Sequence, residues 1–336
     1  MARNQRIFYA CQAVAITTRG DSALAAADVL HGVQSVGMSS TFTLDQVFEL
    51  GQIEIYENIE QIADIEVTLE KVIDGHPLIY DKASGGTCKT DLVAASKNRC
   101  DVYVAIFDDG LSHATGVPRN VCYNSGMFIS SVSYNYTVDG SATESVTLVG
   151  NDRFWNADTA GVIATTATAN WTSASDITSE LDGTNTPLSG VVRRADVDLE
   201  GSTLPSEIKL QGSDDKTGLG GGFHVQSISV STDFGQENIQ ELGRFGPYHR
   251  YATFPIEVTC EFEIIATSGD LISVSGNAEN LSNNTIVIKD TAGTILNLGT
   301  QNKLSSVSYS GGDTGGGNAT VTYSYSNFNV LTVQGG

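Results

Sequence analysis

The chain has 336 residues, of which 39 are acidic and 18 basic, so its formal charge is −21. Only 17% of the residues are charged, against roughly 25% in ordinary globular chains. Proteins that grip nucleic acid or an anionic membrane need clustered Lys and Arg, so this composition argues against both functions. Hydrophobic residues make up 40%, which is enough to form real cores, and the length predicts roughly two domains.

The N-terminus carries basic residues but no apolar signal core, and no apolar run reaches the roughly 18 to 20 residues that span a bilayer. We therefore expect synthesis in the cytosol. The cysteines are odd in number, widely spaced and without a C-x-x-C pair, which predicts free thiols and neither a zinc site nor a redox motif. Cys88 and Cys100 lie close enough in sequence to pair in oxidising surroundings. The five cysteines are Cys11, Cys88, Cys100, Cys122 and Cys260.

Strand signals dominate the chain in sequence order. Asp21 to Leu30 is the best helical stretch, and Gly32 would end it. Residues 132–138 then alternate between apolar and polar side chains, and Asp139-Gly140 offers a turn before the alternation resumes. This pattern predicts a β-hairpin. Residues 321–325 alternate in the same way near the C-terminus, so the chain as a whole is predicted to be all-β.

Six short blocks of the first half recur in the second half in the same order, which predicts an internal duplication. Three pairs of blocks are 192 residues apart, which serine-rich strand sequence does not produce by chance. The next pair is 191 apart and the last two are 175 apart. The pairs are 33–35 with 225–227, Phe42 with Phe234, 49–51 with 241–243, 65–68 with 256–259, 130–134 with 305–309, and 146–147 with 321–322.

The repeated Ile-Glu-Val-Thr strands carry part of the acidic excess on one face. Side chains alternate across a strand, so each repeat sends its Ile and Val to one side and its Glu and Thr to the other. This alignment matches Glu66 with Glu257 and Glu70 with Glu261. A solvated outer face is the plain interpretation, and its recurrence favours a surface with a function. The acidic residues concerned are Glu66, Glu70, Glu257, Glu261 and Glu263.

The sequence contains no G-x-S-x-G elbow, no H-E-x-x-H and no complete P-loop, and its five histidines show no ligand or acid–base spacing. We therefore expect no enzyme activity and no cofactor. Residues 196–207 match part of a calcium-binding loop, but the flanking sequence is not helical and the alternation fits a plain strand. The sequence predicts no metal site, with this loop as the weak alternative. Its carboxylates are Asp196, Asp198, Glu200 and Glu207.

At the repeated blocks the chain resembles the tail tube proteins (major tail proteins) of long-tailed bacteriophages. The resemblance is carried by residues 32–75, 131–155, 193–210 and 224–266, which include the Glu-Leu-Gly turns and the Ile-Glu-Val-Thr strands. It implies an all-β fold with two tandem tube-type β-sandwich or barrel units and a minor short helix. We expect a first unit over 1–158, a linker or loop excursion over 159–190, and a second unit over 191–336.

The resemblance also implies an assembly. Subunits of the family close into rings whose sheets join into one inner barrel, and the rings stack into a tube through which DNA passes. Two units in each chain favour a trimeric ring with pseudo-sixfold symmetry over a hexamer of chains. The expected partners are copies of the chain, the tail terminator, the baseplate or tip, the tape measure protein and, in a contractile tail, a sheath. The expected location is the virion tail, assembled in the host cytoplasm.

Two hypotheses follow for particular residues. The five glutamates of the repeated strands would line the bore and repel phosphate over the roughly 8 Å on which charge acts at physiological salt. Opposite charges would also meet where unit 1 contacts unit 2, although unrelated exposed loops are an equal alternative. The residues of this contact are Glu54, Glu57 and Glu60 in unit 1 with Arg244, His249 and Arg250 in unit 2.

Two other classes of protein remain open at this point. A secreted carbohydrate-binding or adhesive pair of β-sandwiches would explain the Tyr, Thr, Asn and Gly content, but it needs export and the sequence shows no signal peptide. A hydrolase on a β scaffold needs a nucleophile or a pair of carboxylates at a suitable spacing, and the sequence offers neither. The tail tube subunit is therefore the prediction, with the secreted β-sandwich protein as the alternative.

Overall fold

The computed structural model describes the chain in segments separated by short gaps and by four longer ones. It is dominated by β-strands, which confirms the predicted all-β class with a minor helical part. The sequence does not predict the role of residues 159–190, and of these the residues up to 187 lie outside the described part. The described residues are 6–19, 24, 26–90, 92–108, 118–156, 188–202, 204, 208, 224–244, 246–267, 269, 272, 283–312 and 317–335.

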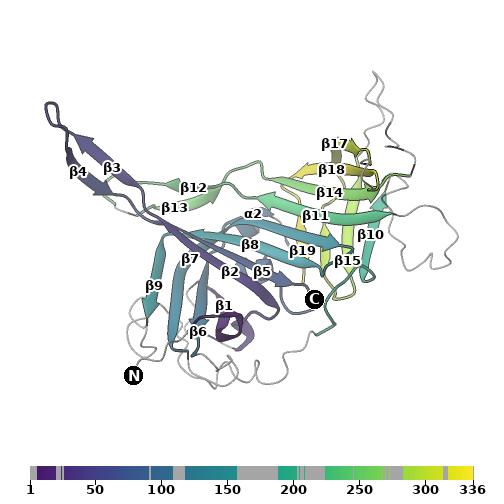
Figure 1. The fold of residues 1–336 in the computed structure, drawn as a ribbon, viewed down its shortest axis with the longest axis horizontal. Helices are drawn as coiled ribbons and strands as arrows, with labels where there is room; N and C mark the ends of the chain where they lie inside the picture. Colours follow the sequence, from purple (N-terminus) through teal and green to yellow (C-terminus); the bar gives the residue numbers. More distant parts are fainter. Residues whose placement is uncertain are drawn as a thin grey trace.

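A long antiparallel sheet runs through the molecule in the order β17-β18-β14-β11-β7-β8-β5-β2 (Figure 1). The hairpin predicted around Asp139-Gly140 is confirmed as β7 and β8, and the predicted alternation at 321–325 lies in β18. The strands are β2 (Val33–Thr41), β5 (Asp64–Val72), β7 (Asn120–Thr137), β8 (Thr143–Gly150), β11 (Val225–Asp233), β14 (Glu257–Ile265), β17 (Lys303–Ser310) and β18 (Thr320–Phe328).

Strand β7 is 18 residues long, and its two ends have different neighbours. The C-terminal part pairs with β8 and β11, whereas the N-terminal part pairs with β6 (Cys100–Ile106) and β9 (Asp152–Asn156). Strand β1 (Gln12–Thr18) completes this corner by pairing with β6. A separate apolar cluster around Tyr103 and Tyr123 fills it. The long strand thus joins the central sheet to the N-terminal segment.

Three smaller sheets surround the central one. A four-stranded sheet in the order β10-β15-β16-β19 covers part of the core, and two hairpins project from the ends of the central strands. We call these hairpins the first arm (β3–β4) and the second arm (β12–β13). The bounds are β3 (Leu44–Phe48), β4 (Ile55–Glu60), β10 (Val197–Ser202), β12 (Gln236–Ile239), β13 (His249–Ala252), β15 (Thr285–Asp290), β16 (Ile295–Asn297) and β19 (Thr332–Gln334).

The predicted helix over 21–30 is wrong in its described part, which holds a 3-10 turn at Ala26–Asp28. Here Leu30 N donates to Val14 O at 2.9 Å, so strand pairing with β1 overrides the helical preference of the alanines. The described α-helices are α1 (Ile79–Ala83) and α2 (Leu92–Ser96). Neither is long and apolar enough to cross a membrane.

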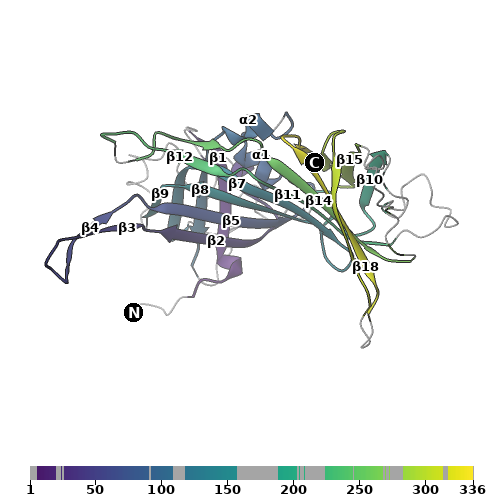
Figure 2. The same cartoon turned by 90° about the horizontal axis from the view of Figure 1, so that it is seen from above.

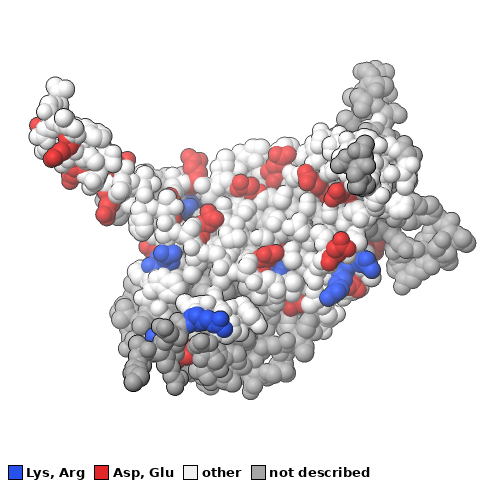
Figure 3. Space-filling view, in the orientation of Figure 1, with Lys and Arg blue, Asp and Glu red and all other residues white. Residues whose placement is uncertain are grey.

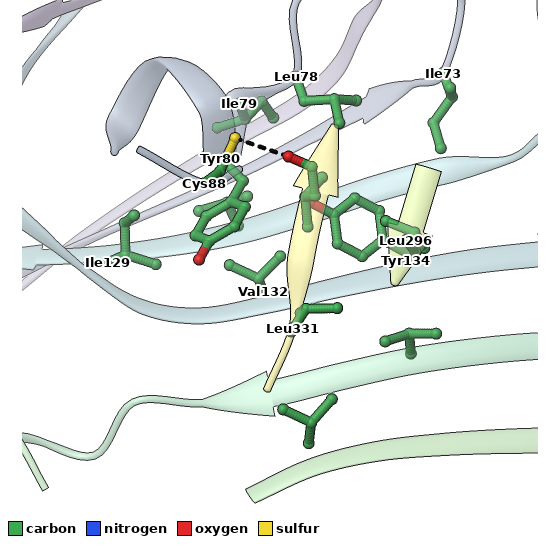
Figure 4. Close-up of a cluster of buried hydrophobic side chains, with 14 of the residues drawn as sticks. Ile73, Leu78, Ile79, Tyr80, Cys88, Ile129, Val132, Tyr134, Leu296 and Leu331 are labelled. Carbon is green, nitrogen blue, oxygen red and sulfur yellow. Dashed lines mark hydrogen bonds between the residues drawn. The ribbon is translucent and has the colours of Figure 1, made fainter. Parts of the chain in front are cut away.

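The core lies between the central sheet and the layer formed by α1, α2 and the four-stranded sheet (Figure 2). One apolar cluster extends through both halves of the chain. Strand β19 reaches α1 from the C-terminal end, where the Cys88 thiol donates to Val333 O at 3.1 Å (Figure 4). All five cysteines are buried and free, as the sequence predicts. The shared core fixes the two halves against each other.

Candidate assembly edges and acidic face

The central sheet consists of two four-stranded blocks with the same internal pairing. The first block is β7-β8-β5-β2 and the second block is β17-β18-β14-β11. Strand β11 stands in the second block where β2 stands in the first, and each has a register shift at its start, between Val33 and Ser35 or between Val225 and Ser227. Strands β7 and β17 correspond likewise and share a register shift at Ser130 and Ser305. The blocks are therefore equivalent strand by strand.

Side-chain hydrogen bonds recur at equivalent places in the two blocks. Ser35 Oγ lies 3.3 Å from Glu70 Oε2, and Ser227 Oγ lies 3.2 Å from Glu263 Oε2. These bonds make Glu70 the counterpart of Glu263, so the sequence alignment with Glu261 was wrong by two residues. Between the arm and the following strand, the second block has one residue more than the first block, whereas the alignment assumed one residue fewer. Because side chains alternate along a strand, an alignment error of two residues leaves each glutamate on the face that was assigned to it.

The sheet face opposite the core is polar along its whole width. Rows of Ser and Thr cross β2, β8, β7, β11, β18 and β17, and carboxylates stand on β5 and β14 between them. In the space-filling view, acidic side chains are spread across the face shown (Figure 3). Glu66, Glu257 and Glu261 are exposed, and Glu70 and Glu263 are half-buried. The five glutamates expected to line a bore therefore share one face, and their facing a bore remains a proposal.

The two blocks meet where β11 pairs with β7, and this junction leaves one open edge at each end of the sheet. Among the described strands of the sheet, β2 pairs only with β5 and β17 only with β18. Because β2 is equivalent to β11 and β17 to β7, the open edges are the same two surfaces that join inside the chain. Such edges are sites of pairing with another strand.

Burial differs sharply between the inner junction and the open edges. Tyr134 on β7 is fully buried, whereas its counterpart on β17, Tyr309, is 56% exposed. Val230 on β11 is fully buried, whereas its counterpart on β2, Met38, is only partly buried. The open edges thus present apolar side chains whose equivalents pack inside a junction. Burying one such side chain contributes about 1.5 to 3 kcal/mol.

The two arms are built alike. Pairs 44–60 and 236–252 have the same register, 192 residues apart. Each arm ends in the repeated Glu-Leu-Gly turn, where Gly51 and Gly243 have φ angles of 96° and 84°. Only glycine adopts this conformation without strain, which accounts for its presence at both tips. The leucine beside each glycine, Leu50 or Leu242, is fully exposed.

The charged residues expected at a contact between units divide between the arms. Arg250 on β13 is buried, and its Nη2 lies 2.7 Å from Asp64 Oδ1 at the start of β5. The carboxylate that meets this arginine within the chain is therefore Asp64, which the sequence analysis did not single out. His249 is half-buried beside it, and Arg244 is exposed over the ring of Tyr248. In the first arm and its tip, Glu54, Glu57 and Glu60 are exposed.

The weak calcium-loop match extends beyond the described residues, since Glu207 lies outside them. Asp198 and Glu200 lie on β10, paired with β15, and Glu200 contacts the ammonium group of Lys289. The described part of the chain contains no group of three or more potential metal ligands. This stretch therefore forms strand in its described part.

No family model matches the chain, and no curated protein matches it by sequence. Two of the similar solved structures are the baseplate and the tube-terminating cap of the anti-feeding prophage. The baseplate chain is 12% identical with a TM-score of 0.33, and the match covers 45% of this chain and 95% of that one. For the cap chain the values are 13%, 0.34, 47% and 95%.

Proposed function

We propose that the chain is a structural subunit of a phage-type tail tube, in which copies join head to tail through β2 and β17. The observation that carries this proposal is the β11–β7 junction. It shows, inside one chain, how an edge equivalent to β2 pairs with an edge equivalent to β17. A head-to-tail contact repeats the same step and closes into a ring when the rotation fits.

Three chains form the proposed ring. Each chain contributes two blocks, so the trimer has six blocks and pseudo-sixfold symmetry around one continuous barrel. The polar face with its five glutamates lines the bore, and the trimer carries three times −21, or −63, formal charges. Carboxylates repel phosphate, so DNA passes without adhering. The exposed leucines at the arm tips, Leu50 and Leu242, contact the next ring of the stack. We propose no catalytic role.

Native mass spectrometry and electron microscopy of the purified protein test the proposed ring. We expect trimers with a central opening, and stacked rings or tubes at high protein concentration. A chain that stays monomeric at every concentration would overturn the proposal. A monomer that binds glycans would instead support the secreted carbohydrate-binding protein.

The acidic face gives a prediction about DNA. Replacing Glu66 and Glu261 together by Lys puts positive charge on the bore, so assembled tubes should retain DNA in a gel-shift assay and slow its ejection. Adding Glu70→Lys, Glu257→Lys and Glu263→Lys should strengthen the effect. The control replaces Asp139 in the β7–β8 turn and Asp152 at the start of β9 by Lys; both are exposed, neither is one of the five glutamates, and the charge changes by the same amount as in the double variant. Unimpaired ejection through the fully reversed bore would refute the role of these glutamates.

A further inference from the structure

The second arm lies on the first block. Arg250 reaches Asp64 on β5 and also donates from Nη2 to Asn151 Oδ1 at 3.2 Å. The ring of His249 meets the ring of Phe128 on β7 edge to face, with centroids 5.3 Å apart. Gln236 Nε2 donates to the carbonyl oxygen of Ile129 at 2.8 Å, which fixes the base of the arm on β7.

An aromatic side chain just before this arm fills the same junction. Phe234 is fully buried, its N–H donates to Ser130 O at 2.8 Å, and its ring lies 6.4 Å from that of Tyr80 on α1. Its counterpart before the first arm is Phe42, which is 68% exposed. The first arm projects away from the body of the molecule (Figure 1), so Phe42 has no block of its own chain to enter. A block beyond β2 would supply one.

We propose that the first arm of one copy lies across the second block of the next copy, as the second arm lies across the first block of its own chain. The occupant is a second copy of this chain, because the equivalent contact already exists within the chain. In this contact Phe42 enters the neighbour's core beside Ser305, the counterpart of Ser130. The inference rests on the proposed ring, and it assigns the arm a partner within that ring.

If the first arm contacts the next copy in the same register as the second arm contacts its own chain, the residues that meet can be named. Glu57 is the counterpart of His249, and Lys303 is the counterpart of Phe128. The aromatic pair of the inner contact thus becomes an oppositely charged pair in the outer one. Leu44 is the counterpart of Gln236, so an apolar side chain stands where Gln236 donates to the backbone oxygen of Ile129 inside the chain. The Arg250–Asp64 pair transfers to Asn58 and Glu257, so the acid is kept there and an amide replaces the arginine as its donor. The new opposite charges are those of Glu57 and Lys303.

The burial of these residues agrees with a missing neighbour. Leu44 is 51% exposed and Leu304 is only partly buried, whereas Ile129 is fully buried. Glu57 and Lys303 are both exposed, so a second copy can reach them. Opposite charges at the rim of such a contact mainly set register and suppress wrong partners. The arm would therefore determine which edge strand of the next copy pairs with β2.

Cysteine cross-linking of the full-length chain tests the contact separately from the ring. One variant combines Glu57→Cys with Lys303→Cys, and a second combines Ser39→Cys with Ser308→Cys, the counterparts of the paired Ser231 and Ser133. A short bismaleimide should link both variants into covalent trimers. Leu50→Cys with Lys303→Cys is the matched control and should stay unlinked, because the arm tip lies away from β17 in the transferred geometry. The wild-type chain should also stay unlinked, since its five thiols are buried.

The outcomes separate the two proposals. A cross-link at 39–308 without one at 57–303 overturns the arm contact and leaves the ring standing. Loss of both cross-links overturns the ring and the arm contact together. A link at 57–303 alone overturns the β2–β17 pairing from which the arm contact was derived, and equal linking of the control overturns the arm contact itself. As a second test, Glu57→Lys should weaken ring assembly on the order of fivefold, and adding Lys303→Glu should restore it. Failure of the double variant to recover would contradict the charge pairing.

Discussion

Replacing Met38 by Glu is expected to stop ring assembly while leaving the monomer folded. Met38 lies on the open edge β2 with its side chain toward the core side, and it is partly buried in the isolated chain. The register of the β11–β7 junction places it opposite Tyr309 of the next copy. A carboxylate there would be buried without a partner, which costs several kcal/mol. Assembly should weaken at least about a hundredfold.

A mixing experiment shows which edges meet. The Met38→Glu chain keeps a working β17 edge, and a Tyr309→Glu chain keeps a working β2 edge. Each alone should remain monomeric, but an equimolar mixture should form a one-to-one dimer and no ring, because only one intact pair of edges remains. Native mass spectrometry of differently labelled chains measures this directly. If β2 paired with β2, the Tyr309→Glu chain would dimerise by itself, which would contradict the head-to-tail contact.

The control for both variants is Thr147→Glu. Thr147 lies on β8 in the middle of the sheet, between Thr68 and Ser131, and it points to the polar face. This variant adds the same charge away from either edge, so it should assemble like the wild type. Unfolding curves of the three variants should show that the edge variants lose assembly rather than fold.

Much of the sheet could be predicted because its strands alternate strictly. The run from Val132 to Val138 sends every second side chain to the core, and a period of two is visible in sequence without any tertiary information. The same reasoning placed Glu66 and Glu261 on one face. The repeated blocks predicted that the two halves are equivalent. They remain recognisable because insertions fall in loops and do not change the pairing of the strands.

The contact between the two blocks could not be predicted in this way. Pairing of β11 with β7 joins residues about a hundred positions apart, and nothing in either strand specifies the other as its neighbour. The partner of Arg250 is one example. Its charge was recognised in the sequence, but Asp64 is the first residue of a strand that carries more conspicuous glutamates. Spatial neighbours across a sheet depend on topology, which composition and periodicity do not contain.

The two α-helices of the described residues could not be predicted from the sequence either. Each has five residues, too few for an apolar stripe of period 3.6 to show. Helix α1 begins where Glu144 accepts two of its N–H groups, and Glu144 lies 64 to 65 residues further along the chain. Lys71 and Glu144 both occupy inward positions of otherwise apolar strands. A charged residue at such a position indicates that a partner group lies nearby in the fold, but the sequence does not say which residue it is.

Replacing Glu144 by Ala is expected to destabilise the chain strongly. Its carboxylate is fully buried and accepts from Ile79 N at 2.6 Å, from Tyr80 N at 3.0 Å and from Tyr134 Oη at 3.1 Å. Burial raises the pKa of the Glu144 carboxyl, and these three donors together with Lys71 act in the opposite direction. Removing one partner of a buried ionic network costs about 3 to 5 kcal/mol. Urea unfolding measures the loss, with Ser145→Ala on the polar face as control.

A double-mutant cycle with Lys71 separates the two roles of this carboxylate. The ammonium group of Lys71 also lies 3.3 Å from Asp74 Oδ1 and 3.1 Å from Pro77 O, so it keeps a counter-charge when Glu144 is removed. The N–H groups of Ile79 and Tyr80 lose their acceptor and stay buried, at about 1 to 3 kcal/mol each. Adding Lys71→Met to Glu144→Ala should therefore recover little stability. Nearly full recovery would mean that charge neutralisation, rather than capping of α1, is the main contribution of Glu144.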